Sequence, residues 1–226
     1  MIKKRDQILE ILYCIVLLAE CIALYKVRPH YYQFTRLLTT LILFVYVYRG
    51  DNTKVFNLYI YVAIAFVALA DILTLFTKNN WFYIGLSLFT FSYLSLSAIF
   101  YRKRKNISRK KIPPTLIVIA ILLIILISLK CFIPEIAMII IPLQSITHAI
   151  VIGILVVWSA KVKSTKMIKN GYLIPASLLI LLANICYTAD IFMFNMQYTI
   201  MRVLVVFLHG LYLLLLFTGI KRIRKR

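Results

Sequence analysis

Five ionisable residues lie within long apolar stretches of the sequence, set in from the ends of those stretches. They are Glu20, Arg36, Asp71, Asp190 and Arg202. Because charge is costly inside a bilayer, such residues usually mark a buried ion pair or a functional site. Two aspartates could share acid and base chemistry, as paired carboxylates do when they stabilise a cationic transition state. An arginine offers a planar guanidinium that suits a phosphate group.

The stretches that carry these residues have the length and composition of membrane-spanning helices. Apolar residues make up 63% of the 226-residue chain, whereas a soluble domain is nearer half apolar. About 20 mostly apolar residues cross a bilayer. The sequence predicts eight such helices, at 8–25, 31–48, 55–77, 81–101, 115–129, 136–158, 172–194 and 199–220. We therefore expect an all-α, polytopic membrane helical bundle that forms a single membrane-embedded domain over residues 1–226.

The basic residues indicate how this bundle is oriented. Of the 27 lysines and arginines, all but six fall in the terminal segments or in alternate loops. The exceptions are Lys26, Arg28, Lys78 and Lys130 in the opposite loops, and Arg36 and Arg202 within spans. Basic residues collect in cytoplasmic loops, so we expect both termini in the cytoplasm. We expect an integral protein of a bacterial inner membrane, with the +20 charge facing anionic headgroups and not nucleic acid.

This orientation places the five ionisable residues at one depth. Each lies three to six residues from the non-cytoplasmic end of its predicted helix. At about 1.5 Å per residue, all five lie about 5–9 Å below that interface. Tyr187 lies one turn before Asp190, on the same helical face. The alternative is a set of structural ion pairs or snorkelling side chains, which fits the long arginines better than the short aspartates.

Metal and cofactor chemistry has no sequence signature in this chain. The four cysteines form no C-x-x-C pair, and the three histidines form no H-x-x-x-H or H-E-x-x-H pattern. His148 and His209 lie in predicted spans, where a hydrogen-bonded packing role is the more common one. We expect no metal and no cofactor.

Three short motifs resemble those of the YhhN (lysoplasmalogenase) family of eight-span membrane proteins. Residues 66–73, Phe-Val-Ala-Leu-Ala-Asp-Ile-Leu, resemble its small-residue-then-Asp motif. Residues 82–89, Phe-Tyr-Ile-Gly-Leu-Ser-Leu-Phe, are similar to its F-x-x-G-L-x-x-F pattern, and residues 189–192, Ala-Asp-Ile-Phe, to its second Asp motif. The chain departs from the family at Ala70 (usually Gly), at Tyr93 (often His), and at Thr35 and Arg36 (Lys-Pro).

The resemblance implies hydrolysis of the vinyl ether bond of lysoplasmalogens, which releases a fatty aldehyde. It implies Asp71 and Asp190 as the catalytic pair, one protonating the alkenyl carbon while the other stabilises the cation and activates water. A lysophospholipid substrate from the membrane would then contact the remaining candidates, with the arginines at its phosphate and Tyr93 at the family's histidine position. These substrate-binding candidates are Arg36, Tyr93, Tyr187, Glu20 and Arg202.

The residues alone also allow a second class of function. Acids inside the bilayer also serve as proton relays and coupling sites, so a non-enzymatic lipid or small-solute transporter or a lipid-binding membrane protein is the alternative. Transport favours broken helices near the midplane, and Pro142 and Pro175 are the candidate kinks. The clustering of charges on one side favours a one-sided pocket over a pathway through the membrane.

Overall fold

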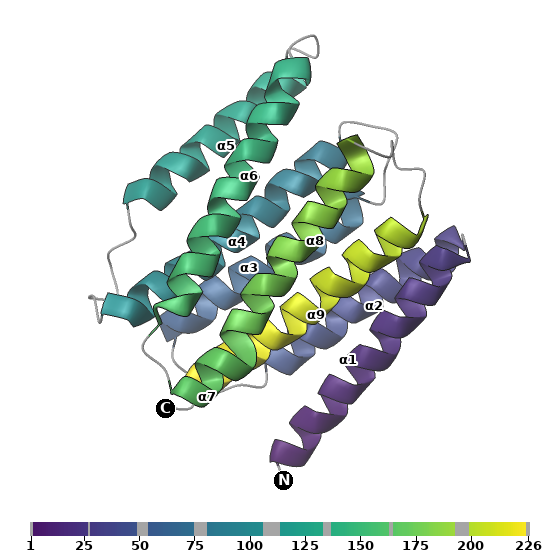
Figure 1. The fold of residues 1–226 in the computed structure, drawn as a ribbon, viewed down its shortest axis with the longest axis vertical. Helices are drawn as coiled ribbons and strands as arrows, with labels where there is room; N and C mark the ends of the chain where they lie inside the picture. The colour runs from purple at the N-terminus through teal and green to yellow at the C-terminus, as the bar shows by residue number, and fades with distance from the viewer. Residues whose placement is uncertain are drawn as a thin grey trace. The chain divides into compact units, whose positions relative to one another are not determined.

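The computed structural model describes residues 2–26, 28–48, 54–74, 81–105, 114–132, 137–162, 165–192 and 199–224. Every regular element in these ranges is a helix (Figure 1). The elements are α1 (Ile2–Tyr25), α2 (Pro29–Tyr48), α3 (Lys54–Thr74), α4 (Trp81–Lys105), α5 (Pro114–Phe132), α6 (Ala137–Ala160), α7 (Lys166–Ile168), η2 (Lys169–Leu173), α8 (Ile174–Phe192) and α9 (Thr199–Arg224). Because α7, η2 and α8 join end to end, the described chain forms eight helices, which confirms the all-α prediction.

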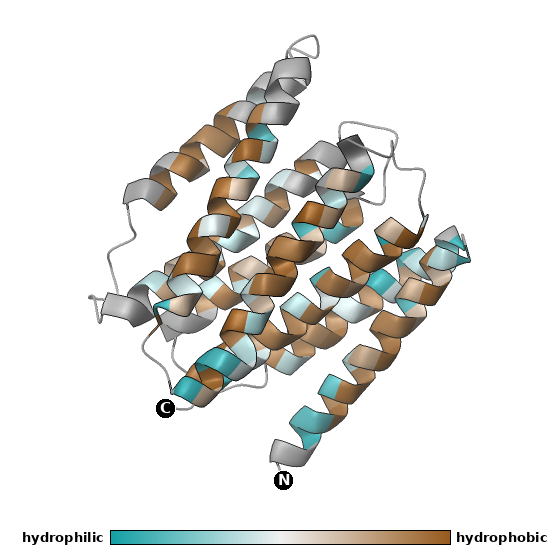
Figure 2. Ribbon diagram, in the orientation of Figure 1, coloured by the Kyte–Doolittle hydropathy of each residue, from teal (hydrophilic) through white to brown (hydrophobic). Residues whose placement is uncertain are grey.

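Several of these helices are long and apolar enough to cross a bilayer. Among the described residues, four segments qualify: Arg5–Tyr25, Leu143–Ala160, Lys166–Tyr187 and Thr199–Ile223. Two shorter apolar stretches are Leu58–Leu73 and Ser87–Tyr101. Large apolar side chains such as Ile11, Phe34 and Ile185 are exposed. Figure 2 shows hydrophobic colouring over most of α1, α8 and α9, with hydrophilic turns near the beginning of α1. The chain is therefore a multi-pass membrane protein, since such extensive apolar surface needs lipid as its solvent.

The helices belong to two compact parts, and the first comprises Met1–Asp51 and Ser164–Arg226. In this part α1 packs against α2 and α9, and α8 packs against α9. The Tyr13 hydroxyl of α1 donates a 3.0 Å hydrogen bond to the Gly210 carbonyl of α9. A Cβ atom at Gly210 would collide with the Leu17 side chain, so glycine allows α1 and α9 to approach closely.

The second part comprises Asn52–Lys163. Here α3 packs on α4, and α6 packs on both α4 and α5. The rings of Phe66 and Phe91 stack with centroids 5.5 Å apart, which sets the register of α3 against α4. Tyr101 and Trp158 make a similar contact at 5.0 Å between α4 and α6. The prediction of one domain over residues 1–226 stays a prediction.

The helix that begins at Lys166 starts six residues earlier than the sequence predicted. Its first turns are rich in lysine and resemble a loop in composition. A π-helical turn follows, in which the Ile174 amide donates to the Lys169 carbonyl five residues earlier. Pro175 has no amide hydrogen and its ring crowds the preceding turn, so the wider turn relieves the conflict. The first helix likewise begins at Ile2 and not at residue 8, whereas the predicted ends at 75–77 and 193–194 lie outside the described residues.

Candidate polar site within the helical bundle

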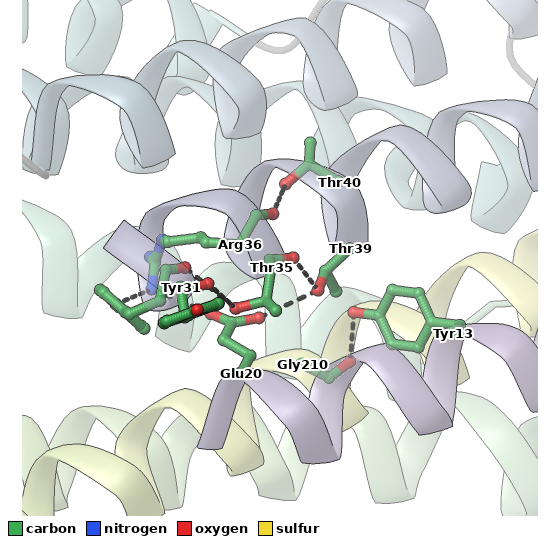
Figure 3. A network of polar contacts seen from close by, with 9 residues as sticks. Tyr13, Glu20, Tyr31, Thr35, Arg36, Thr39, Thr40 and Gly210 are labelled. Atoms are coloured by element: carbon green, nitrogen blue, oxygen red, sulfur yellow. Dashed lines mark hydrogen bonds and ion pairs between the residues drawn. The ribbon is translucent and has the colours of Figure 1, made fainter. Parts of the chain in front are cut away.

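Glu20 and Arg36 form a buried ion pair between α1 and α2 (Figure 3). The Glu20 side chain is 4% exposed, and its Oε1 lies 3.5 Å from an Arg36 guanidinium nitrogen. The Thr39 hydroxyl donates a 3.0 Å hydrogen bond to the other Glu20 oxygen. Arg36 also donates a 2.6 Å hydrogen bond to the Tyr32 hydroxyl. Buried charges need such pairing and hydrogen bonding to be tolerated, so this arrangement has the form of a structural ion pair.

Asp190 of α8 is buried and lies beside Arg202 of α9. The Arg202 Nε atom is 3.8 Å from Asp190 Oδ2, and the Arg202 side chain is 46% exposed. The second carboxylate oxygen, Oδ1, is buried and has no hydrogen-bond partner among the described residues. Since a buried polar atom normally has a partner, this oxygen is a suitable acceptor for a bound hydroxyl group or water. Tyr187 lies one turn earlier on α8 and is partly buried.

The register of α1 against α9 brings these two ion pairs to the same level. Tyr13 and Gly210 are in contact, and the two helices run antiparallel. Glu20 lies seven residues after Tyr13, and Arg202 lies eight residues before Gly210. Since both helices rise equally per residue, Glu20 and Arg202 lie at nearly one depth, and their partners Arg36 and Asp190 lie beside them. The acids and bases of these two pairs balance in charge.

Asp71 belongs to the second part and ends the buried stripe of α3. Ile60, Ile64, Val67 and Asp71 recur at spacings of three and four and are all buried, which places them on one helical face. In this part α3 packs against α4. Asp71 lies five residues after Phe66, so the antiparallel register set by the aromatic stack places Asp71 nearly level with Ser87 of α4.

A row of buried polar side chains lies between α4 and α6, and we call it the α4–α6 seam. The Gln144 amide donates a 2.6 Å hydrogen bond to the Ser87 hydroxyl. One turn further along, the Thr90 hydroxyl and His148 Nδ1 are 2.7 Å apart and share a hydrogen bond. The Tyr93 and His148 rings pack with centroids 5.3 Å apart. Tyr93, the expected substitute for the family's histidine, therefore lies against an imidazole from another helix.

A second polar cluster joins α1, α2 and α9 at the end of the first part that holds both chain termini. Lys221 is buried, and its ammonium group donates a 2.7 Å hydrogen bond to Asp6 and a 3.1 Å hydrogen bond to the Tyr46 carbonyl. The Tyr46 hydroxyl donates a 2.7 Å hydrogen bond to Glu10 and lies 3.1 Å from the Thr218 hydroxyl. Lys221 was expected among the headgroup-facing charges, and Asp6 and Glu10 were not predicted to contact it, although Asp6 directly follows the Lys-Lys-Arg run and Glu10 lies one helical turn further along.

The structure thus pairs Asp190 with Arg202 and Glu20 with Arg36, and packs Tyr93 against His148. Asp71 and Asp190 belong to different parts, and their pairing stays a prediction. In the ranges given above, no three His, Cys, Asp or Glu side chains come together as a metal-binding set.

Long apolar helices with buried carboxylates and ion pairs define an integral membrane protein whose largely apolar interior holds a few charged groups. The YhhN family model matches residues 31–218, so the chain belongs to the YhhN family. This membership confirms the resemblance drawn from the motifs, and the family includes lysoplasmalogenases. No curated protein and no solved structure matches the chain. The matched region begins after α1, which nevertheless contributes Glu20 to the ion pair with Arg36.

Proposed function

We propose that the protein is a membrane-embedded lysoplasmalogenase that hydrolyses the vinyl ether bond of a lysophospholipid. The observation that carries this proposal is the environment of Asp190, a buried carboxylate with one oxygen beside an arginine and the other without a hydrogen-bond partner among the described residues. Asp71 is a second buried carboxylate, and the chain belongs to a family that includes enzymes of this activity.

The topology that we propose has eight membrane crossings and both termini in the cytoplasm. The alternating distribution of basic residues supports this orientation. Within the first part, the Asp6–Lys221 contact holds the beginning of α1 against the end of α9, as an even number of crossings requires. Because the ionisable residues lie towards the opposite ends of their helices, the site would open to the non-cytoplasmic leaflet.

The reaction needs one proton donor and one proton acceptor. In our mechanism the donor transfers its proton to the alkenyl carbon that is not bonded to oxygen, which leaves an oxocarbenium ion. Water adds to this cation and loses a proton to the acceptor, and the hemiacetal then breaks into an aldehyde and the glycerol hydroxyl. The net reaction consumes one water molecule. We assign the acceptor to Asp190, since the neighbouring Arg202 stabilises a negative charge there, and the donor to Asp71.

The two arginines would have different tasks in this site. Arg36 is 14% exposed and already binds Glu20 and Tyr32. The Arg202 side chain is 46% exposed, and its Nε atom lies 3.8 Å from Asp190, which is a long contact for an ion pair. A guanidinium with accessible donors can bind a phosphate in a bidentate manner. We therefore place the substrate phosphate at Arg202 and treat Arg36 as part of the scaffold.

Aldehyde release by the purified protein in detergent or nanodiscs tests this function. A lysoplasmalogen is the substrate, and the matching lysolipid with a saturated ether bond is the unreactive control. Asp71→Asn and Asp190→Asn keep the side-chain shape but remove the carboxyl group, and each should lower kcat by about 100-fold or more. Glu10→Gln makes the same chemical change in the second polar cluster and should leave kcat unchanged. Full activity in both aspartate variants would refute the mechanism, and an inactive wild type would refute the function.

A further inference from the structure

The α4–α6 seam concentrates polar groups where a membrane helix pair would ordinarily present small or apolar ones. Ser87, Thr90, Gln144 and His148 are all less than 9% exposed. Gln144 donates a 2.6 Å hydrogen bond to Ser87, and Thr90 and His148 share a hydrogen bond of 2.7 Å. Polar and ionisable side chains inside membranes are expensive and are usually functional. A group that can gain and lose a proton near neutral pH, as an imidazole can, stands out among them.

The proposed reaction creates a need for such a group. In each turnover the donor carboxyl loses its proton to carbon, and a different carboxylate receives a proton from water. The donor must therefore be reprotonated before the next turnover. Asp71 lies nearly level with Ser87 of the seam. Ser87 is three residues, or about 4.5 Å of helix rise, from Thr90, whose hydroxyl shares a hydrogen bond with His148.

We propose that His148 is a positioning residue that returns a proton to Asp71 after each turnover, through the hydroxyl groups of the α4–α6 seam. This role rests on the proposed lysoplasmalogenase activity. His148 takes up a proton at one ring nitrogen and releases one from the other, and the hydroxyl groups of Thr90 and Ser87 accept and donate in the same direction. Asp190 releases to solvent the proton that it took from water, and His148 takes one proton from solvent. The number of protons on the protein is therefore unchanged after each turnover, and no oxidant or co-reactant is needed.

The surroundings of His148 suit this role. The titratable side chain of Tyr93 of α4 packs against its ring, and Gln144 lies one turn before His148 on α6. The other neighbour of α6 in this part is α5, which has no titratable residue from 116 to 128. This stretch of α5 therefore brings no charged side chain to the α4–α6 seam.

A packing role and a proton-carrying role predict different effects of the same substitution. Glutamine in place of His148 can still exchange a hydrogen bond with Thr90 but cannot carry a proton. If His148 only packs, His148→Gln should restore what His148→Ala loses. If it carries protons, both variants should lose kcat by about 10- to 100-fold, with KM within about twofold of wild type.

The experiment measures kcat and KM for aldehyde release across pH 5–9 in nanodiscs. The variants are His148→Gln, His148→Ala and Thr90→Val, with His209→Gln as the matched control at a histidine of α9 in the first part. We expect both His148 variants to lose kcat and its pH dependence near neutrality. Thr90→Val removes the hydroxyl that bonds to His148 but leaves the histidine in place, and it should also lower kcat. This second variant tests the relay even if the histidine variants fold poorly.

The outcomes separate this inference from the proposed function. Wild-type kcat and an unchanged pH profile in His148→Gln, beside inactive Asp71→Asn, would overturn the role of His148 and leave the function standing. An equal loss in His209→Gln would also overturn it, because the effect would then be general to membrane histidines. An inactive wild type would overturn both the function and this role.

Discussion

The buried ion pair between Glu20 and Arg36 provides a quantitative test of the first part of the bundle. Neutralising one partner, by Glu20→Gln or Arg36→Gln, leaves the other charge buried. Such a change typically lowers the free energy of unfolding by about 3–5 kcal/mol. Because the pair is 3.5 Å apart and Arg36 is 14% exposed, we expect a loss of stability at the lower end of this range, about 3 kcal/mol.

The double variant separates the pair from its surroundings. With both charges removed, the hydrogen bonds to Thr39 and Tyr32 can still form with glutamine, and no charge is left without a partner. The double variant should therefore be no less stable than either single variant, which corresponds to a coupling energy of about 3 kcal/mol. For a chain of this length, about 3 kcal/mol lowers Tm by about 6–12 °C.

Thermal unfolding in one detergent, with Lys161→Gln as an exposed control, measures this cycle. The control should change Tm by no more than about 1–2 °C, as surface substitutions do. Additive losses in the double variant would refute the ion pair. Aldehyde release by the double variant, measured below its Tm, should stay within about threefold of wild type. A roughly tenfold higher KM in the folded double variant would instead show that Arg36 binds substrate.

Three further perturbations test other contacts. Asp6→Asn should lower the free energy of unfolding by about 3 kcal/mol, because it leaves Lys221 buried without its carboxylate. Lys221→Met in the same chain should recover most of the lost Tm. Equal Tm values for Asp6→Asn and wild type would contradict this contact. Gly210→Val should lower the free energy of unfolding by about 1–3 kcal/mol by overpacking against Leu17, and adding Leu17→Ala to this variant should recover part of the loss. An unchanged Tm in Gly210→Val would contradict the close approach of α1 and α9. Arg202→Gln should raise KM for a lysoplasmalogen by about 10- to 100-fold through loss of a charge-assisted hydrogen bond to phosphate, and an unchanged KM would remove Arg202 from the phosphate site.

The helices were predictable because a membrane imposes a simple rule on sequence. Backbone groups must be satisfied within each span, so apolar stretches separated by short basic loops specify helices and their order. The prediction failed at residues 166–171, where lysines and an asparagine resemble a loop although the backbone there is helical. Lysines can reach the interface from the end of a helix, so composition alone does not mark the boundary.

The ionisable residues were predictable, but their partners were not. Burial cost alone singled out Glu20 and Asp190, whereas the choice of Arg36 or Arg202 as a partner depends on which helices are neighbours. The seam formed by Thr90 and His148 was less visible still. Serine and threonine are common in membrane helices, and only the packing of α4 on α6 shows that these hydroxyl groups face polar side chains.

Hydrolysis in heavy water most directly tests whether the protein acts on a vinyl ether by protonating carbon. Wild-type protein and a lysoplasmalogen are incubated in D₂O, and the aldehyde is reduced at once to the alcohol and analysed by mass spectrometry. Protonation of the alkenyl carbon predicts one deuterium at the carbon next to the former carbonyl, formed by wild type and lost together with the product in Asp71→Asn and Asp190→Asn. No aldehyde from wild type, or the same labelled product at the same rate from both aspartate variants, would contradict it.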